Sequence, residues 1–232
     1  MENMLARFVQ ERQIPIFGVA NADGFKHALP GWYPKELMPR CESVIIFGRP
    51  FAARYPYVVE EKHIANDAWW EVNEAVTLEV AKWRGELINL FDECGLATAN
   101  FGGYGPTSEP TFSYRLAQYE AGIGVYGRFG VCLNPDFGCY YKVGVLLTDA
   151  ELTPTEKAKL DKFSPCDDCR KCAEVCPVRA IDPSKSPLLG YNRDLCIRFI
   201  LKMKEKHGET AKICARCFSV CPWGWEMQGA SS

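Results

Sequence analysis

The distribution of cysteine is the feature of this 232-residue sequence that most constrains its fold. Eight of the twelve cysteines lie between Cys166 and Cys221, and the other four are scattered through the first 165 residues. Six of the eight are matched by an internal repeat with an offset of 45 residues. The matched positions are Cys169, Cys172, Cys176 and Pro177 in the first copy and Cys214, Cys217, Cys221 and Pro222 in the second. A segment this rich in thiols must fold around whatever the thiols bind.

The first copy predicts iron–sulfur ligation. Its spacing, Cys-x2-Cys-x2-Cys-x3-Cys-Pro, is the run in which three cysteines hold one 4Fe-4S cluster and the fourth binds the other cluster of a pair. The second copy has Ala211 where the first has Cys166, and Cys196 can supply the missing ligand. We therefore predict one cluster on Cys166, Cys169, Cys172 and Cys221, and a second on Cys176, Cys196, Cys214 and Cys217. Zinc is the alternative, but this is not zinc-ribbon spacing.

Composition narrows the class of protein. Hydrophobic residues make up 47% and charged residues 24%, as in an ordinary globular protein, and the net charge is -2. No global basic field is present to hold a nucleic acid. The sequence shows no export signal and no run of about 18 apolar residues, so we expect a cytoplasmic protein without a membrane span. In a reducing compartment, cysteines indicate metal or redox chemistry more often than disulfides.

The first 150 residues alternate between helix-like and strand-like segments. We expect helices over 2–12, 34–38, 66–94 and 111–120, and strands over 14–20, 43–47, 96–101 and 140–147. Gly85 marks a break in the longest helix, and Thr153 to Glu156 open a further short helix. The pattern predicts an α+β fold with a sheet covered by helices. The expected domains are residues 1–162 and the two-cluster domain, 163–226.

A glycine-rich turn contains Gly122, Gly124 and Gly127 in the spacing G-x-G-x-x-G. A nicotinamide-binding fingerprint would follow a strand and open a helix, whereas the residues before this turn look helical and a loop follows it. We therefore reject that interpretation. The glycines are expected to end a helix and to let the backbone approach another group closely; a purely structural turn is the alternative.

From Ala121 to Leu152 the sequence resembles the core of epoxyqueuosine reductases and reductive dehalogenases. Those families carry A-G-x-G-x-x-G-[KR]-N, then P-E-[FY]-G, then L-T-D. The counterparts here are Ala121, Gly122, Gly124, Gly127 and Arg128, then Pro135, Asp136, Phe137 and Gly138, then Leu147, Thr148 and Asp149. The segments around Cys196 and from Cys214 to Trp223 resemble the same families' double-cluster domain.

The resemblance implies a cobalamin-dependent reductase. Such families bind cobalamin base-off in a nitroreductase-like α/β domain, followed by a bacterial-ferredoxin-like domain whose two clusters reduce the cobalt to Co(I). The implied cofactor contacts are Gly122, Gly124, Tyr126, Gly127, Arg128, Phe129, Pro135, Phe137 and Gly138. For Arg128, a surface ion pair is an equal alternative. Cys132 and Cys139, which flank the turn, are expected to be buried packing residues, as are the remaining two scattered cysteines.

The sequence departs from the families' pattern in two places. Phe129 stands where those families have Asn, and their D-[ST]-A-P acid segment falls on Ser108, with Glu109 beside it. Dehalogenases use a tyrosine instead, so Tyr104 and Glu109 are the candidate proton donors. The ordinary alternatives are a loop aromatic for Tyr104 and a solvated charge for Glu109. The transfer-RNA-holding extension of full-length epoxyqueuosine reductases is also absent, so a modified transfer RNA is not the expected substrate.

Three functions fit these observations. The first is a cobalamin-dependent reductase of a small organic substrate, supplied by an external low-potential electron donor such as ferredoxin or flavodoxin. The second is an electron-transfer protein that reduces a corrinoid held by another protein, docking through a face near Trp223 and Trp225. The third is a cobalamin-handling protein without turnover. We favour the first, and expect neither nucleic acid nor membrane as a partner.

Overall fold

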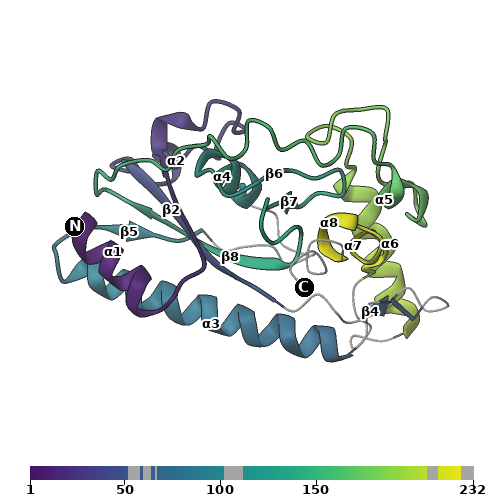
Figure 1. Ribbon diagram of the computed structural model, residues 1–232, viewed down its shortest axis with the longest axis horizontal. Coiled ribbons are helices and arrows are strands. Elements are labelled where there is room, and N and C mark those ends of the chain that lie inside the picture. Colours follow the sequence, from purple (N-terminus) through teal and green to yellow (C-terminus); the bar gives the residue numbers. More distant parts are fainter. Residues whose placement is uncertain (52–57, 60–63, 66, 102–111, 208–213, 226–232) are drawn as a thin grey trace. The chain divides into compact units, whose positions relative to one another are not determined.

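The chain folds into two compact units built from interleaved segments (Figure 1). The computed structural model describes residues 1–51, 58–59, 64–65, 67–101, 112–207 and 214–225. The first unit comprises Met1–Pro50, Ala75–Gly124 and Tyr141–Phe163, and the second comprises Phe51–Glu74, Val125–Tyr140 and Ser164–Ser232. The predicted boundary between residues 162 and 163 therefore marks only one of the points at which the chain passes between units. Val125–Tyr140, which we assigned to the first domain, groups with the cysteine-rich segment.

A four-stranded antiparallel sheet forms the core of the first unit. Its strand order is β1-β2-β8-β5. The strands are β1 (Ile16–Asn21), β2 (Ser43–Pro50), β5 (Thr98–Ala99) and β8 (Tyr141–Thr148). β2 pairs with β8 along its whole length, from Ser43 opposite Thr148 to Pro50 opposite Tyr141. The predicted strands over 14–20, 43–47 and 140–147 are confirmed, whereas the one expected over 96–101 is shorter.

Helices cover both faces of this sheet. The run from Ser43 to Gly48 is buried without alternation, so β2 needs cover on both sides. α1 (Glu2–Glu11) and α3 (Asp67–Asp92) lie on one face, and α4 (Tyr114–Glu120) lies on the other (Figure 1). The short elements η1 (Ala22–Gly24) and α2 (Pro34–Leu37) complete this unit. Within the described residues, no helix combines the length and hydropathy needed to cross a bilayer.

Two local expectations for the first unit are wrong. α3 continues through Gly85 without a break. The helix is held by backbone hydrogen bonds, which glycine also makes, and Gly85 lies where a side chain would contact nothing within 4 Å. Thr153 to Glu156 form no helix. The backbone of Thr155 instead donates to the carbonyl of Val19 at 2.9 Å, and the Thr155 hydroxyl accepts from the Val19 amide at 2.9 Å. This segment thus covers the outer edge of β1.

The second unit has short elements held by the cysteine-rich segment. They are β3 (Val58–Val59), β4 (Ile64–Ala65), β6 (Val125–Tyr126), β7 (Cys132–Leu133), α5 (Lys171–Glu174), α6 (Arg193–His207), α7 (Arg216–Ser219) and α8 (Pro222–Trp225). β3 pairs with β4 and β6 with β7, each antiparallel. α5 and α7 are offset by 45 residues and pack against each other, so the internal repeat in the sequence is also a structural repeat.

The close approach of β1 to the end of α4 gives a stability test. A Cβ added at Gly18 would lie 2.5 Å from the carbonyl oxygen of Ala121, whereas one added at Gly85 would meet nothing within 4 Å. We expect Gly18→Ala to lower the free energy of unfolding by about 1–3 kcal/mol through overpacking. The control Gly85→Ala should raise it by up to about 1 kcal/mol through helix propensity. Urea unfolding measures both, and a Gly18→Ala protein as stable as the parent would contradict the tight contact.

Candidate metal centre

The structure brings the eight clustered cysteines together in two groups of four. In the first group, Cys166 and Cys172 interact electrostatically with each other and with both Cys169 and Cys221. The second group consists of Cys176, Cys196, Cys214 and Cys217. Cys217 also interacts with Cys172, so the two groups are neighbours. All of these residues are free thiols, and the two ligand sets derived from their spacing stay a prediction.

The repeat explains how each half contributes to both groups. α5 carries Cys172 and α7 carries Cys217, and each helix ends at a valine that is followed by Cys-Pro. Proline cannot continue the preceding hydrogen-bond pattern, so the chain turns away after the last cysteine of each copy. The last cysteine of one copy consequently joins the group formed by the other. Cys196, in the first turn of α6, takes the place of the cysteine missing from the second copy.

Electrostatics make these groups unfavourable for thiolates unless a cation is present. Burial, together with the neighbouring cysteines, raises the pKa of the Cys172 thiol to about 12. Burial likewise raises the pKa of Cys217 well above its ordinary value, again with contributions from surrounding thiols. Four negative sulfurs in one buried place repel one another. A bound metal reverses this preference because it deprotonates its coordinating thiols.

The backbone nevertheless provides hydrogen-bond donors for negative sulfur atoms. The Ala180 amide donates to the Cys176 sulfur at 3.2 Å. Backbone N–H groups of three further residues lower the pKa of three thiols by the same kind of bond. The donor and acceptor pairs are Arg128 with Cys166, Arg216 with Cys214, and Trp223 with Cys221. Such donors suit sulfur that carries charge in the functional state.

Thiols are ligands for single metal ions as well as for iron–sulfur clusters. In the described part of the chain, no three His, Cys, Asp or Glu side chains surround a point that one metal ion could occupy. A 4Fe-4S cluster makes a different demand, because its four thiolates are spread over the iron atoms of one cluster. Each group contains four thiols, which is the number of ligands that one such cluster requires.

Arg128 is a structural residue of the second unit. Its side chain is 6% exposed, so the surface-pair alternative is wrong. The guanidinium donates hydrogen bonds to four backbone carbonyls. A contact with a corrin could use only an N–H group that these four bonds do not occupy. The acceptors are Cys166 at 2.9 Å, Asp167 at 3.1 Å, Pro183 at 3.2 Å and Lys185 at 2.7 Å. Arg128 thereby joins the first cysteine loop to the 183–185 turn, a bond set that the planar five-donor guanidinium is suited to make.

The glycine turn contacts the protein's own atoms. α4 precedes it, the two-residue strand β6 follows it, and the sheet of the first unit is antiparallel, so the rejection of a Rossmann fingerprint is confirmed. Gly122 has a φ of +71°, and a Cβ there would lie 2.9 Å from the Glu156 carbonyl oxygen. A Cβ at Gly127 would lie 2.9 Å from the carbonyl oxygen of Val131. These close approaches account for both glycines.

The Pro-Asp-Phe-Gly turn is held by Asn134. Its side-chain oxygen accepts from the amides of Asp136 at 2.8 Å and Phe137 at 3.0 Å, and its backbone pairs with Gly138. Pro135 and Phe137 are half-buried on this turn, as is Tyr126 on β6. These three side chains keep exposed surface with which they could contact a ligand.

The predicted cofactor contacts are divided between the two units. Gly122 and Gly124 belong to the first unit, and the others belong to the second. Phe129 is buried and packs edge-on against Phe218, with ring centroids 4.9 Å apart. The proton-donor candidates, Tyr104 and Glu109, lie outside the described residues. Among the four scattered cysteines, Cys41, Cys132 and Cys139 are buried as expected, whereas Cys94 is exposed, so its assignment as a packing residue is wrong.

Sequence reasoning missed Lys142 on β8. Its backbone lies opposite Arg49 of β2, and burial lowers the pKa of its ammonium. Arg49 pairs with Glu79 of α3 at 3.0 Å, whereas the Lys142 ammonium forms neither a hydrogen bond nor an ion pair with the described residues. The available signal was a charged residue inside an otherwise apolar strand, Tyr-Tyr-Lys-Val-Gly-Val-Leu-Leu.

Comparisons with known proteins point to two related groups of enzymes. No protein-family model matches the chain. It is 29% identical over 114 residues to the tetrachloroethene reductive dehalogenase of Dehalobacter restrictus, a match that covers 45% of this chain and 21% of the dehalogenase. It is 24% identical over 214 residues to the epoxyqueuosine reductase of Francisella cf. novicida, a match that covers 85% of this chain and 57% of the reductase.

Solved structures agree with the sequence matches in fold. A crystal structure of selenomethionine-labelled epoxyqueuosine reductase superposes with a TM-score of 0.64 at 17% identity, over 96% of this chain and 66% of that chain. A reductive dehalogenase structure, described as suggesting a mechanism for B12-dependent dehalogenation, superposes with a TM-score of 0.63 over 94% of this chain and 31% of that chain. The chain thus spans about a fifth of the length of the reductive dehalogenase and less than two thirds of the epoxyqueuosine reductase that it matches in sequence.

Replacing Arg128 tests its structural role. Arg128→Met removes four hydrogen bonds and leaves buried carbonyls without their donor, so we expect a loss of about 3–5 kcal/mol in unfolding free energy. Arg128→Lys keeps the charge but not the planar fork, and should lose more than half as much. The control Arg179→Met changes an exposed arginine and should stay within about 0.5 kcal/mol of the parent. Equal stabilities of the Arg128→Met variant and the parent protein in urea would show that Arg128 is dispensable.

Lys142 gives a pH-dependent prediction. Its folded-state pKa is lowered, so between that pKa and the unfolded value near 10.4 the unfolded chain binds more protons, and stability rises with pH. Lys142→Met should therefore raise the free energy of unfolding at neutral pH by roughly 1 kcal/mol, and the gain should shrink as pH approaches 10. Lys82→Met, at a side chain 74% exposed, is the control and should give little change at any pH. A gain that is constant with pH would contradict the buried-charge argument.

Proposed function

We propose that this chain, a member of the epoxyqueuosine reductase and reductive dehalogenase-like family, is a reductase that passes electrons through two 4Fe-4S clusters to cobalamin. The observation that carries the proposal is the arrangement of eight free thiols in two neighbouring groups of four. The proposed ligands are Cys166, Cys169, Cys172 and Cys221 for one cluster and Cys176, Cys196, Cys214 and Cys217 for the other. Sequence matches to iron–sulfur and cobalamin-linked reductases support it.

The protein's own contribution to electron transfer is to hold and bury the two groups. Arg128 fixes the loop that carries Cys166, and the packing of α5 on α7 fixes Cys172 beside Cys217. Because Cys172 is near enough to Cys217 to raise its pKa, we expect the proposed clusters to be close enough to exchange single electrons. When bound, the clusters supply low-potential one-electron chemistry. The amide donors to the sulfurs then set how readily each cluster accepts an electron.

Cobalamin is proposed from the family relationship. Five of the nine residues implied as contacts, Gly124, Gly127, Arg128, Phe129 and Gly138, are buried in the protein. The described residues therefore supply only part of the surface that a corrin would contact. Tyr126, Pro135 and Phe137 retain the exposed surface that such a contact requires.

Reduction of an organic substrate also needs a proton. Tyr104 and Glu109 remain our predicted donors. Lys142 is a further candidate in the described part of the chain, because burial predisposes its Nζ atom to release a proton. A small organic molecule is the proposed substrate.

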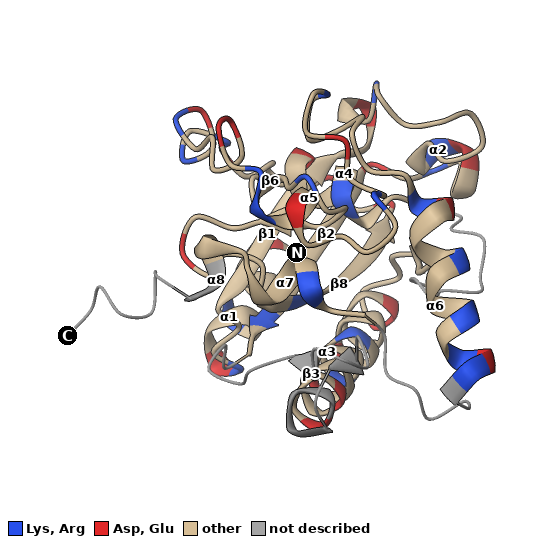
Figure 2. Cartoon of the chain, turned by 90° about the vertical axis from the view of Figure 1, so that its right-hand side faces the viewer, with Lys and Arg blue, Asp and Glu red and all other residues tan. Residues whose placement is uncertain are grey.

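Electrons must come from outside the chain, and we propose a low-potential donor such as ferredoxin or flavodoxin. α6 carries the proposed ligand Cys196 and also displays exposed Arg198, Lys202 and Lys206 (Figure 2). Exposed cations beside a cluster ligand suit an acidic electron-transfer protein. The docking role considered for Trp223 is less favoured, because its indole donates to the Pro165 carbonyl at 3.2 Å within the cysteine-rich fold.

Anaerobic reconstitution tests the proposed cofactors. The protein should take up about eight irons and eight sulfides per chain, because each 4Fe-4S cluster contains four of each. Added cob(II)alamin should then give a base-off signal by electron paramagnetic resonance (EPR). Two clusters without any change in the cobalamin spectrum would contradict cobalamin binding and leave an electron-transfer protein. Absence of iron uptake would overturn the whole proposal.

The assignment of Cys196 has its own test. Cys196→Ala should lower iron content from about eight to about four per chain, because one cluster loses its fourth thiolate while the other keeps all of its ligands. The matched control, Cys94→Ala, removes an exposed cysteine outside both groups and should keep all the iron. Retention of both clusters by Cys196→Ala would show that another residue completes the second group.

A further inference from the structure

The turn that precedes α6 exposes two adjacent leucines. Leu188 is 48% exposed and Leu189 is 73% exposed. Among the described residues, eight large apolar side chains are exposed, and half of them lie between positions 188 and 201; Leu195 and Leu201 of α6 are the other two of this group. Single apolar side chains on a surface are ordinary, whereas a group of them bordered by polar residues marks an interaction site.

Backbone hydrogen bonds fix the shape of this turn. The Asp182 amide donates to the Gly190 carbonyl at 2.7 Å and closes the turn, and the Gly190 amide donates to the Ser186 carbonyl at 2.8 Å. A Cβ added at Gly190 would lie 2.6 Å from the Asp182 carbonyl oxygen, so the two ends of the turn approach each other closely. Arg128 anchors the turn through the Lys185 carbonyl at 2.7 Å. The two leucines are therefore presented on a preorganised segment, which lowers the entropy that a partner loses by binding it.

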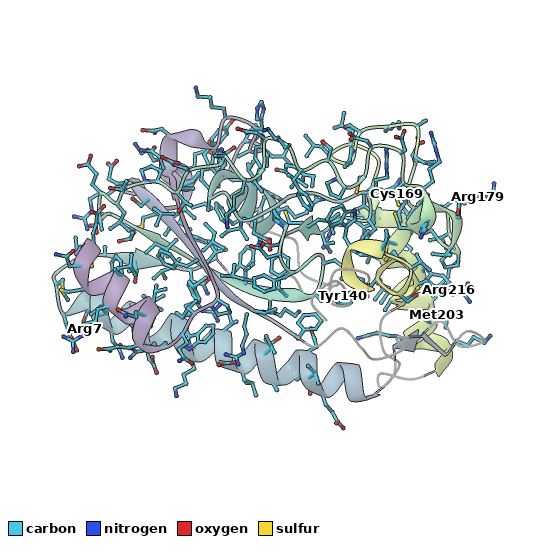
Figure 3. The ribbon with its side chains drawn as sticks, viewed as in Figure 1. Arg7, Tyr140, Cys169, Arg179, Met203 and Arg216 are labelled. Atoms are coloured by element: carbon cyan, nitrogen blue, oxygen red, sulfur yellow. The ribbon has the colours of Figure 1, made fainter. Side chains whose placement is uncertain are left out.

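α6 has a half-buried face and an exposed face. Side chains three or four positions apart share a face of a helix, and Cys196, Phe199 and Met203 form the half-buried one (Met203 is labelled in Figure 3). The exposed face adjoins the leucine turn, because the Asn192 side chain accepts from the Leu195 amide at 3.1 Å where the turn meets the helix. The exposed face comprises Leu195, Arg198, Leu201 and Lys202.

The segment from 182 to 207 is basic, although the chain as a whole is not. It contains six Lys or Arg residues and three Asp or Glu residues, whereas the whole chain has a net charge of -2. The basic residues along α6 form the blue bands of that helix in Figure 2. A local excess of positive charge attracts an acidic partner and speeds the encounter. An apolar centre with a polar border is also the usual anatomy of a protein–protein interface.

We propose that this leucine–cation surface is the docking site for the external electron carrier, a small acidic electron-transfer protein. The residues of the surface are Leu188, Leu189, Leu195, Arg198, Leu201 and Lys202. The inference rests on the proposed function, because it needs a cluster bound by Cys196. That cysteine lies on the same helix, about 9 Å along the axis from Lys202, which favours a redox partner over other acidic proteins. In the step itself, the reduced carrier loses one electron and the cluster gains it, and no bond forms or breaks.

Electron-transfer rates of the reconstituted whole chain test the inference. Iron and sulfide are counted first. Each protein is then mixed anaerobically with reduced 2Fe-2S ferredoxin or with flavodoxin hydroquinone, and the second-order rate of cluster reduction is followed by stopped-flow absorbance over a range of salt concentrations. Reduction by dithionite serves as a reference that needs no protein docking. The surface variants are Leu189→Ser and the double variant Arg198→Glu with Lys202→Glu.

The first unit offers a matched control for each surface variant. Leu78 of α3 is 71% exposed, close to the 73% of Leu189, so Leu78→Ser makes the same change at another place. Lys82 and Lys159 are exposed in the first unit, so Lys82→Glu with Lys159→Glu changes the net charge by the same amount as the double variant on α6.

All of the variants should keep eight irons and the parent's rate with dithionite. The double variant on α6 should slow reduction by either carrier about tenfold or more at low salt, and the difference should shrink as salt screens the charges. Leu189→Ser should slow it about fivefold at every salt concentration, because the lost contact is apolar. Both controls should stay close to the parent.

Three results would overturn the inference and leave the two proposed clusters in place. In the first, the surface variants are no slower than their controls. In the second, dithionite reduces the parent but neither carrier does. In the third, the parent is a dimer that Leu189→Ser converts into a monomer, because a second copy of the chain would then occupy the surface. A parent protein without iron would instead refute the proposed function.

Discussion

The second unit depends on one electrostatic constraint, the collection of many thiols in a small and partly buried volume. Burial raises the pKa of these thiols, and their proximity raises it again. Amide groups donate to the sulfurs, as at Cys176, and the iron of the proposed clusters would neutralise the remaining negative charge. The short helices of this unit, α5 and α7, carry Cys172 and Cys217 and position their sulfur atoms.

The segment from Val125 to Tyr140 supplies the framework for that placement. Arg128 joins two loops through backbone carbonyls, and Tyr140 holds the α7 turn through the Phe218 carbonyl. Gly130 admits the ring of Tyr191, whose hydroxyl in turn hydrogen-bonds the Cys196 sulfur. Residues that resemble a cofactor-binding motif in the sequence thus serve the cysteine groups. Arg128, Gly130 and Tyr140 thus contact three different parts of the cysteine-rich segment: the loops at Cys166 and Lys185, the ring of Tyr191, and the α7 turn.

The sequence predicted the parts of the structure whose physics is local. Apolar periodicity acts over a few residues and located β2, β8 and α3. Thiol spacing is equally local, and the cluster ligation that it predicts stays a prediction. The interleaving of units could not be foreseen, because it depends on long-range contacts such as Arg128 with Lys185. For the same reason, the sequence did not predict the structural role of Arg128. A basic residue after a glycine turn reads equally well as a ligand contact, and only its four distant acceptors identify it as structural.

Some polar side chains on the sheet of the first unit have hydrogen-bond partners, whereas Lys142 has none among the described residues. Ser43 and Thr148 are buried in the sheet and satisfied, since Ser43 accepts from the Leu152 amide and Thr148 donates to the Ala97 carbonyl. Asp149 accepts from the Ala97 amide, so the L-T-D motif anchors β5 to the end of β8. Among the described residues, the half-buried Lys142 has no such partner. Packing explains the side chains that have partners. Partial burial lowers the pKa of Lys142, which agrees with the proton-donor role that we propose for it.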